Sequence, residues 1–262
     1  MRRANLALET LDIAPPRPGM GPVSGGLWES GADTLSGRIV RQICAALFAD
    51  ELTPGERLGT EASLSQRFGV SRMAIRDSLR SLAAAGILDI RVGQRGGIFV
   101  ASGNPERLAE TLAIQIKLIG VDIEEILDAQ IAIEVTAAGL AARNANPADI
   151  AGLKEEITAM EREIDAPDAF TRASLGFHES IVAASRNRVL IAQFKALRHI
   201  LTPLYSRRTT TTIALRALAS HRALVACIEA RDPDAARDLM RRRLETVRAG
   251  HLAAAGQDHA KD

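Results

Sequence analysis

The sequence predicts a mainly α protein, in which an N-terminal winged helix-turn-helix is followed by a C-terminal all-α antiparallel helical bundle. Two observations predict this class. Apolar residues recur at helical spacing along most of the chain, and the alternation typical of strands is confined to residues 87–100. The chain has 262 residues, of which 25% are charged and 47% hydrophobic, which is enough for one or two globular domains.

Four segments are predicted along the chain. Residues 1–33 form a flexible arm, because eight of the twelve residues at positions 15–26 are Pro or Gly. Residues 34–101 form the winged helix-turn-helix, and residues 105–252 form a second, helical domain. Residues 253–262 form a flexible C-terminal tail.

The helix-turn-helix begins with two helical patterns. Apolar residues recur at helical spacing from Leu35 to Leu47, and the pattern stops before the turn signal at residues 53–55. Thr60 can cap a short second helix. Gly69 can end that helix, because glycine tolerates the positive φ of the position that follows a helix.

A third helix is predicted from Ser71 to Ala85, with two opposite faces. An apolar stripe points inward and a basic stripe with i, i+4, i+8 spacing points outward. The two stripes are Ile75, Leu79 and Leu82, and Arg72, Arg76 and Arg80, respectively.

A hairpin follows the third helix. Residues Leu88 to Val92 and Ile98 to Val100 predict two short strands, joined by a glycine-rich tip that carries Arg95. A hairpin after a helix-turn-helix is a wing. Beyond it, helical periodicity and first-turn prolines predict six or seven helices between residues 105 and 255; these prolines are Pro105, Pro147, Pro167 and Pro233.

The basic residues of the wing and the third helix fit the chemistry of DNA. Residues 34–100 hold nine Arg against six acidic residues, a surplus of +3, whereas the whole chain has a net charge of +1. Arginine can donate two hydrogen bonds to a guanine edge in the major groove, and other basic side chains neutralise phosphates. The predicted DNA contacts are Ser71, Arg72, Met73, Arg76, Arg91, Gly93 and Arg95. A solvated helix face is the alternative interpretation of the arginine stripe taken alone.

The sequence also indicates in which cellular compartment the protein is found. We find no membrane-spanning helix and no signal peptide, and Cys44 and Cys227 lack the spacing of a disulfide framework or a thiolate metal site. We therefore expect a cytoplasmic protein without a membrane partner.

Residues 35–100 resemble the DNA-binding domain of GntR-type bacterial transcription regulators. The resemblance rests on the segments PGERL, FGVSR and RDSL and on the glycine-rich wing. It implies a homodimer that binds a short palindromic operator in double-stranded DNA. One residue departs from the pattern: Ala62 follows Glu61 where an arginine is common, which removes one expected DNA contact.

Residues 105–250 resemble the helical effector domain, called FCD, of the FadR-like branch of that superfamily. The segments are IEVTAAGLAARNA, GFHESIVAASRNRVL and SHRALVACIEARDPDAARDLMRRRLETV. The resemblance implies a small-molecule pocket, in which many members hold a divalent metal through one Asp and three His. His178 and His221 match two of these ligands, but Ser174 stands at the Asp position and Arg243 at the last His.

Two of the four ligands are thus replaced, one of them by a cation. We therefore predict no tightly bound metal and no cofactor, with His178 and His221 as the ligands if a metal is found. Arg243 would instead pair with the carboxylate of a small acidic metabolite. The complete predicted effector site is Gln130, Glu134, Ser174, His178, His221 and Arg243.

Other interpretations remain open at this point. His178 can be a hydrogen-bonded core residue, and Arg243, within the run of arginines at 241–243, can belong to a solvated face. A metal-dependent enzyme using His178 and His221 is one rival, although Val182 replaces the second His of an H-E-x-x-H motif. An architectural DNA binder without an effector is another. The sequence favours a ligand-responsive transcription regulator, a repressor released from its operator by the metabolite, over both.

Overall fold

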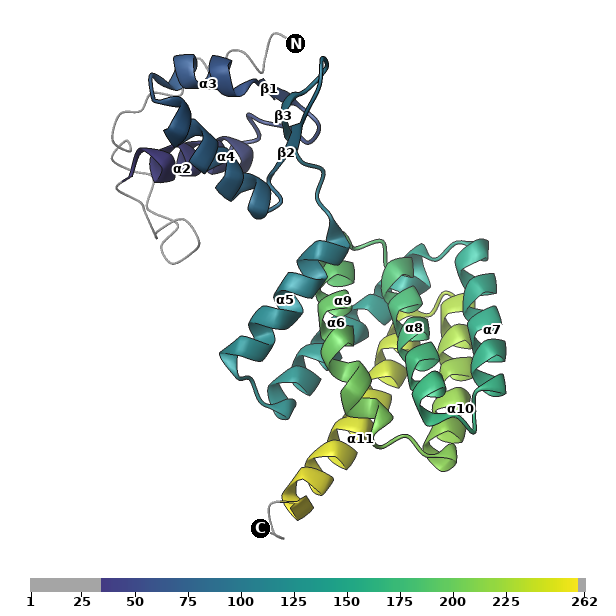
Figure 1. Cartoon of the computed structure of the whole chain (residues 1–262). Coiled ribbons are helices and arrows are strands. Elements are labelled where there is room, and N and C mark those ends of the chain that lie inside the picture. Colours follow the sequence, from purple (N-terminus) through teal and green to yellow (C-terminus); the bar gives the residue numbers. More distant parts are fainter. Residues whose placement is uncertain (1–33, 259–262) are drawn as a thin grey trace. The chain divides into compact units, whose positions relative to one another are not determined.

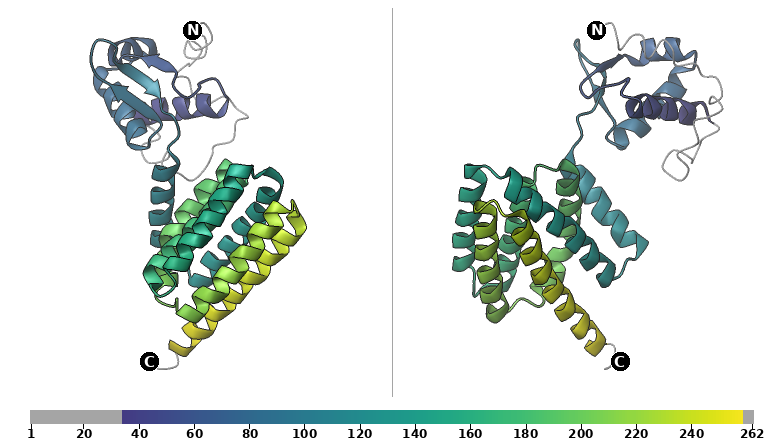
Figure 2. Two further views of the ribbon diagram at one scale, coloured as in Figure 1. Left: turned by 90° about the vertical axis from the view of Figure 1, so that its right-hand side faces the viewer. Right: turned by 180° about the vertical axis from the view of Figure 1, so that it is seen from behind.

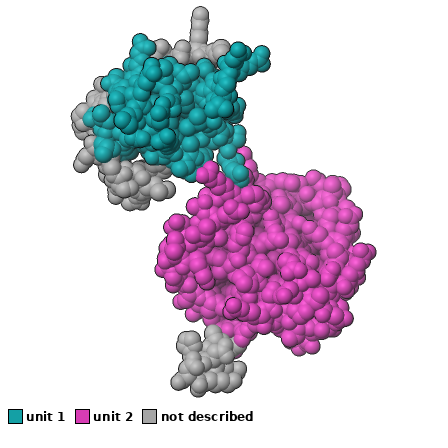
Figure 3. Space-filling view, viewed as in Figure 1, with its two compact units in different colours: residues 1–104 teal, residues 105–262 magenta. Residues whose placement is uncertain are grey.

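The computed structural model describes residues 34–258, so the arm predicted for residues 1–33 lies outside the described part. The chain divides into two compact units, residues 1–104 and residues 105–262 (Figure 3). The first unit combines helices with a small sheet, and the described part of the second unit is helical (Figure 1). The mainly α class is confirmed.

Between residues 34 and 104, the first unit contains three helices and a three-stranded sheet. The sheet is antiparallel with the strand order β1-β3-β2, and Leu88 pairs with Val100 in the β2-β3 hairpin. The sequence did not indicate β1, which is only three residues long. The elements are α2 (Leu35–Phe48), β1 (Arg57–Gly59), α3 (Glu61–Phe68), α4 (Arg72–Ala84), β2 (Leu88–Arg91) and β3 (Gly97–Val100).

One apolar core holds this unit together. The inward stripe of α4 is buried as predicted: Ile75 and Leu82 are fully inaccessible and Leu79 is 1% exposed. Side chains from the other two helices, including Ile39 of α2 and Phe68 of α3, pack into the same cluster. This burial sets the rotation of α4, so its opposite face points to solvent.

The second unit is a bundle of seven described helices, within the predicted number. Four of them begin at the predicted prolines, because a proline in the first turn loses no helical hydrogen bond. The helices are α5 (Pro105–Ile119), α6 (Ile123–Asn144), α7 (Pro147–Arg162), α8 (Pro167–Ala184), α9 (Arg188–Ser206), α10 (Thr211–Glu229) and α11 (Pro233–Asp258).

Helix α6 lies between two apolar clusters of the bundle. Ala138 and Ala141 of α6 belong to a cluster with side chains from α7, α8, α10 and α11. Leu127 and Ile133 of the same helix belong to a second cluster, formed with α8 and α9. The long helix α11 packs along α6 (Figure 2). The inward-facing polar side chains of α6, Gln130 and Glu134, are therefore enclosed by the surrounding helices.

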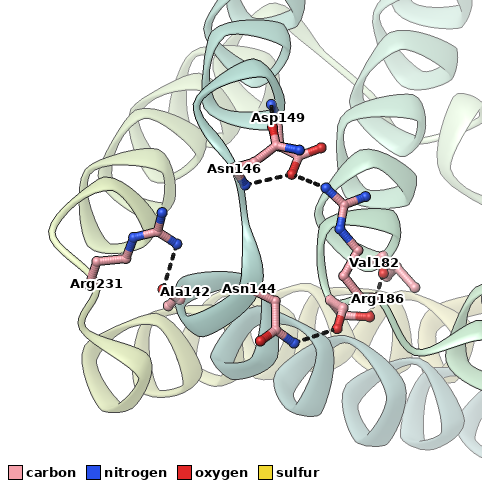
Figure 4. Close-up of polar contacts among 8 residues, drawn as sticks. Ala142, Asn144, Asn146, Asp149, Val182, Arg186 and Arg231 are labelled. Atoms are coloured by element: carbon pink, nitrogen blue, oxygen red, sulfur yellow. Dashed lines mark hydrogen bonds and ion pairs between the residues drawn. The ribbon is translucent and has the colours of Figure 1, made fainter.

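Polar contacts tie the corner between α6 and α7 to neighbouring helix ends (Figure 4). Asn144 donates to the carbonyl of Ser185 at 2.8 Å, and Arg231, in the turn before α11, donates to the carbonyl of Ala142 at 3.3 Å. Arg186 pairs with Asp149, which also accepts the N–H of Asn146. These contacts fix the ends of α6, α8 and α10 against one another.

The last helix is longer than expected. Residues 253–258 continue α11, so the predicted tail at residues 253–262 is helical at its start, and residues 259–262 lie outside the described part. The reason is composition: residues 253–255 are all alanine, which has the highest helix propensity.

Helix α10 is the one described helix that is long and apolar enough to cross a membrane by length and composition. In the structure it packs within the bundle against α7 and α11, with Leu218, Leu224 and Ile228 in the core. This packing accounts for part of its apolar character, while Ile213 and Leu215 near its start remain exposed.

Candidate functional site

The turn between α3 and α4 presents the start of α4 to solvent. Gly69 ends α3 with φ 63°, as its position after the helix predicted. Ser71 then caps α4, since its hydroxyl accepts the N–H of Ala74 at 3.2 Å. The predicted first residue of the helix is thus its cap, and the free N–H groups of the first turn point outward beside it.

The outward face of α4 carries the predicted arginines. Arg72, Met73 and Arg76 are all exposed, and the side chain of Met73 is 75% accessible. Arg76 is held by Glu61 at the start of α3, whose carboxylate accepts from Nε at 3.3 Å and from a terminal nitrogen at 3.0 Å. Both nitrogens donate to the same oxygen, Oε2, and this contact orients the guanidinium and raises the pKa of Arg76.

The sequence could not indicate the contact between Glu61 and Arg76, because the two residues lie fifteen positions apart in different helices. Glu61 is also the residue that precedes Ala62, the departure from the family pattern. It is therefore a functional candidate that sequence reasoning missed.

The hairpin tip is kept slim by glycine. A Cβ atom at Gly96 would lie 2.4 Å from the carbonyl oxygen of Arg91, and Gly93 has φ 102°. Arg57 of β1 donates to the carbonyl of Gly96 at 3.1 Å, which supports the tip from the neighbouring strand. This backbone path requires glycine at both positions, including the predicted Gly93.

The two wing arginines differ in their surroundings. The guanidinium of Arg91 lies 4.2 Å from the centre of the Phe99 ring and 3.6 Å from the carboxylate of Asp89. Arg95 stands exposed at the tip. Arg91 is thus restrained by its own hairpin, and Arg95 is the more accessible cation of the two.

A buried polar core lies inside the helical bundle. Glu134 is fully inaccessible, and its carboxylate accepts from Gln130 at 2.7 Å and from Nδ1 of His178. Nε2 of His178 lies 3.2 Å from Nε2 of His221, and a terminal nitrogen of Arg243 lies 3.0 Å from the same atom of His221. Five of the six predicted effector residues thus form one connected network from α6, α8, α10 and α11.

Ser174 is the sixth predicted residue. It lies on α8 one turn before His178 and is 9% exposed. No hydrogen bond joins it to the network among the residues that the structure describes.

Burial makes both imidazoles neutral. Desolvation lowers the pKa of His221 well below its ordinary value, and the charge of Arg243 lowers it further. Desolvation also lowers the pKa of His178, against the opposing effect of the Glu134 carboxylate. The network therefore holds one carboxylate and one guanidinium, linked through two uncharged rings.

Two further residues extend the network, and neither was among the residues predicted from the sequence. The hydroxyl of Tyr205 donates to Gln130, and its ring stacks on His251 with the ring centres 5.1 Å apart. His251 is 7% exposed, and its burial lowers its pKa to about 4. Tyr205 is the only tyrosine of the chain, which was the one available hint.

The core is closely packed around these groups. The ring of Phe177 covers His221 at a centre-to-centre distance of 4.4 Å. Two surface pockets lie elsewhere, against α5 and α9, and include residues such as Ile116, Lys117 and Ile200 but no member of the polar core. The predicted effector residues therefore lie close together and form their hydrogen bonds mainly with one another.

The family-implied metal does not fit these donors. Among residues 34–253, no group of three or more His, Cys, Asp or Glu side chains is placed to hold a metal ion. The guanidinium of Arg243 contacts the imidazole nitrogen that would have to ligate the metal. The zinc-protease interpretation fails as well, since Glu179 pairs with Arg198 and Lys195 and Val182 is buried.

A capped helix with an exposed basic face, a short helix before it and a basic hairpin after it define a winged helix-turn-helix, and with it a DNA-binding transcription regulator. The model for bacterial regulatory proteins of the gntR family matches residues 35–100, and the FCD domain model matches residues 125–246. The chain belongs to the gntR family and carries an FCD domain.

The descriptions of similar proteins agree with this family assignment. The chain is 30% identical over 207 residues to RmpR of Mycobacterium gastri, described as an HTH-type transcriptional regulator, with 77% of this chain and 74% of that protein covered. It is 29% identical over 224 residues to an Escherichia coli protein described as an L-lactate dehydrogenase operon regulatory protein, covering 81% and 84%. The solved Streptococcus agalactiae GntR shares the fold at 20% identity, with a TM-score of 0.54 over 82% of this chain and 99% of that one.

Proposed function

We propose that this DNA-binding regulator is a ligand-responsive repressor, a cytoplasmic homodimer that leaves its operator when a small carboxylate-bearing metabolite binds the helical domain. The observation that carries the proposal is that the chain has both an exposed arginine face on α4 and, in the helical bundle, a guanidinium whose Nε has no hydrogen-bond partner among the described residues. Its chemistry is binding and release, without a catalytic step.

Arg72, Met73 and Arg76 occupy the first turns of α4, where a recognition helix meets base edges. We assign Arg72 and Arg76 to base contacts and Ser71 to a phosphate contact through its cap position. Glu61 positions Arg76, since its carboxylate holds the guanidinium edge-on at 3.0 Å.

Wing residues Arg91, Gly93 and Arg95 are assigned to the backbone or minor groove beside the recognition helix. Arg95 is the principal contact there, because Arg91 is restrained by Phe99 and Asp89. A backbone contact contributes affinity but no sequence preference.

Operator binding tests the DNA half. Fluorescence anisotropy with a labelled duplex from the chain's own promoter region should show about 5- to 150-fold weaker binding for Arg72→Ala or Arg76→Ala, the effect of losing a contact to a base edge. Arg162→Ala, an exposed arginine on α7, is the matched control and should bind as the wild type does. Unchanged affinity in both α4 variants would remove α4 as the recognition helix.

The effector half rests on Arg243. His221 anchors one terminal nitrogen of its guanidinium, while Nε has no hydrogen-bond partner among the described residues. A buried donor without a partner costs free energy that a ligand acceptor recovers. A carboxylate is the acceptor that suits a guanidinium edge, and Gln130 and Glu134 complete the polar wall.

A ligand can shift DNA affinity only by binding one arrangement of the protein better than another. The polar core joins four helices, so a carboxylate that competes with Glu134 for Arg243 would change contacts on all of them. Repacking of this network is the conformational change that we assign to the effector.

Exposed apolar side chains support the homodimer. Leu108, Ile114, Leu118 and Ile119 of α5 are 54–73% accessible. We assign this surface to contact with a second copy, and light scattering on the purified chain should give twice the monomer mass of 28.0 kDa. Monomers at micromolar concentration would contradict the assignment.

Calorimetry with a panel of short mono- and dicarboxylates tests the effector. The panel includes lactate, since one relative is described as a regulator of an L-lactate dehydrogenase operon. A carboxylate that binds should do so at least about tenfold more weakly in Arg243→Ala, because a charge-assisted pair is lost. Arg242→Ala, exposed and one position away, is the matched control. A bundle that binds no carboxylate and releases no DNA would favour an architectural DNA binder.

A further inference from the structure

The two buried imidazole rings face each other through the same atom, Nε2. The Glu134 carboxylate accepts from Nδ1 of His178, which places the proton of this neutral ring on Nδ1 and leaves a lone pair on Nε2. That Nε2 faces Nε2 of His221 at 3.2 Å. The orientation of His178 is thus fixed by a carboxylate behind it.

His221 presents a lone pair as well. An arginine nitrogen can only donate, so Nε2 of His221 accepts from Arg243 at 3.0 Å. The proton of this ring is then on Nδ1, which has no hydrogen-bond partner among the described residues. Nε2 is also the atom through which each ring would ligate a metal, and the guanidinium of Arg243 already contacts that atom of His221.

The spacing of these lone pairs suits a metal. Two nitrogen ligands about 2.0–2.1 Å from a tetrahedral ion lie about 3.3 Å apart. The two Nε2 atoms are 3.2 Å apart, and the carboxylate on the far nitrogen of His178 is the arrangement that orients metal-bound histidines. The positive group that is actually present beside them is the guanidinium of Arg243.

We propose that Arg243 is a built-in cation that takes the place of a divalent metal beside His178 and His221, and that its guanidinium, together with the missing carboxylate at Ser174, keeps metal out of this site. The charge balance agrees: Glu134 and Arg243 together are neutral, and a divalent ion added to them would leave a net charge of +2 in an apolar interior. Ser174, one turn before His178, withholds the carboxylate that would offset part of that charge.

The proposal predicts that two substitutions restore metal binding. Arg243→His removes the guanidinium and adds a third imidazole, and Ser174→Asp adds a carboxylate from the same face of α8 as His178. The donors of the double variant are three imidazoles and one carboxylate, a set that first-row transition metals prefer.

The experiment titrates the full-length wild type, Arg243→His and the Ser174→Asp/Arg243→His double variant with Co²⁺ alone, followed by visible absorption, and with Zn²⁺ alone, followed by calorimetry. We expect no stoichiometric binding in the wild type and one equivalent in the double variant, tighter by at least about 100-fold. The single variant should lie between them. Arg242→His, which adds an imidazole at an exposed neighbouring position, should behave as the wild type does.

Three results would overturn the proposal. The first is one equivalent of metal in the wild type, which needs no variant to fold. The second is a double variant that keeps the helical circular dichroism of the wild type but gains no metal. The third is a gain of metal binding that survives His178→Ala in the same background. None of these readouts involves DNA or a carboxylate, so they are independent of the proposed repressor function.

Discussion

Replacing Glu134 by alanine should destabilise the helical domain strongly. The carboxylate is fully buried and accepts from Gln130 at 2.7 Å and from Nδ1 of His178. Its removal leaves two buried donors without an acceptor, at about 1–3 kcal/mol each. It also leaves the charge of Arg243 without its counter-charge, and breaking a buried ionic network in this way costs about 3–5 kcal/mol in total.

Urea unfolding followed by circular dichroism measures this loss. For a domain of this size, about 3–5 kcal/mol corresponds to a midpoint of thermal unfolding about 6–20 °C lower. Glu155→Ala, at an exposed position of α7, is the matched control and should change stability by less than about 0.5 kcal/mol. The double variant Glu134→Ala/Arg243→Ala should lose less than the sum of the single losses, because the two charges compensate each other.

The reasoning would be refuted by a Glu134→Ala protein that loses less than about 1 kcal/mol, or by strict additivity with Arg243→Ala. Either result would mean that Glu134 and Arg243 are solvated independently and that the polar core is not one network.

The buried histidines give the stability a pH dependence. The pKa of His251 is about 4 in the folded chain and about 6.5 when unfolded, so the unfolded chain binds protons first and stability should fall as pH drops from about 6.5 to 4. His178 and His221, whose pKa values are also lowered, act in the same direction. Thermal unfolding across this range should show a shallower fall in His251→Phe, which keeps a ring beside Tyr205, and an equally steep fall would contradict this role. In the DNA-binding unit, Leu82→Ala should lower the free energy of urea unfolding by about 2–5 kcal/mol, because Leu82 is fully buried on the inner face of α4. A decrease below about 1 kcal/mol would mean that this side chain does not anchor α4 to the core.

Local chemistry made much of the fold predictable. Thr60 and Ser71 cap the helices that follow them, and Gly69 adopts the positive φ expected of a residue that ends a helix. The wing strands were predicted to within a residue at each end, because alternation and glycine spacing are local signals. The arginine stripe of α4 is exposed for the same reason, since helical periodicity determines which face is buried.

Features that depend on contacts between residues far apart in the chain could not be predicted from the sequence. Strand β1 has three residues, too few for a period-two pattern, and exists because β3 offers it an edge. Glu61 reaches Arg76 only because α3 and α4 cross, and Tyr205 meets His251 across two helices. The position of Ser174 was identified by resemblance, but its separation from the hydrogen-bonded network required coordinates.

The guanidinium beside His221 is attached to α11 by covalent bonds. A chelator cannot strip it away, and a shortage of zinc or nickel in the surroundings cannot leave its place empty. The positive charge of the polar core is therefore part of the polypeptide itself, so every folded copy of the chain carries it, whatever the metal content of the surroundings.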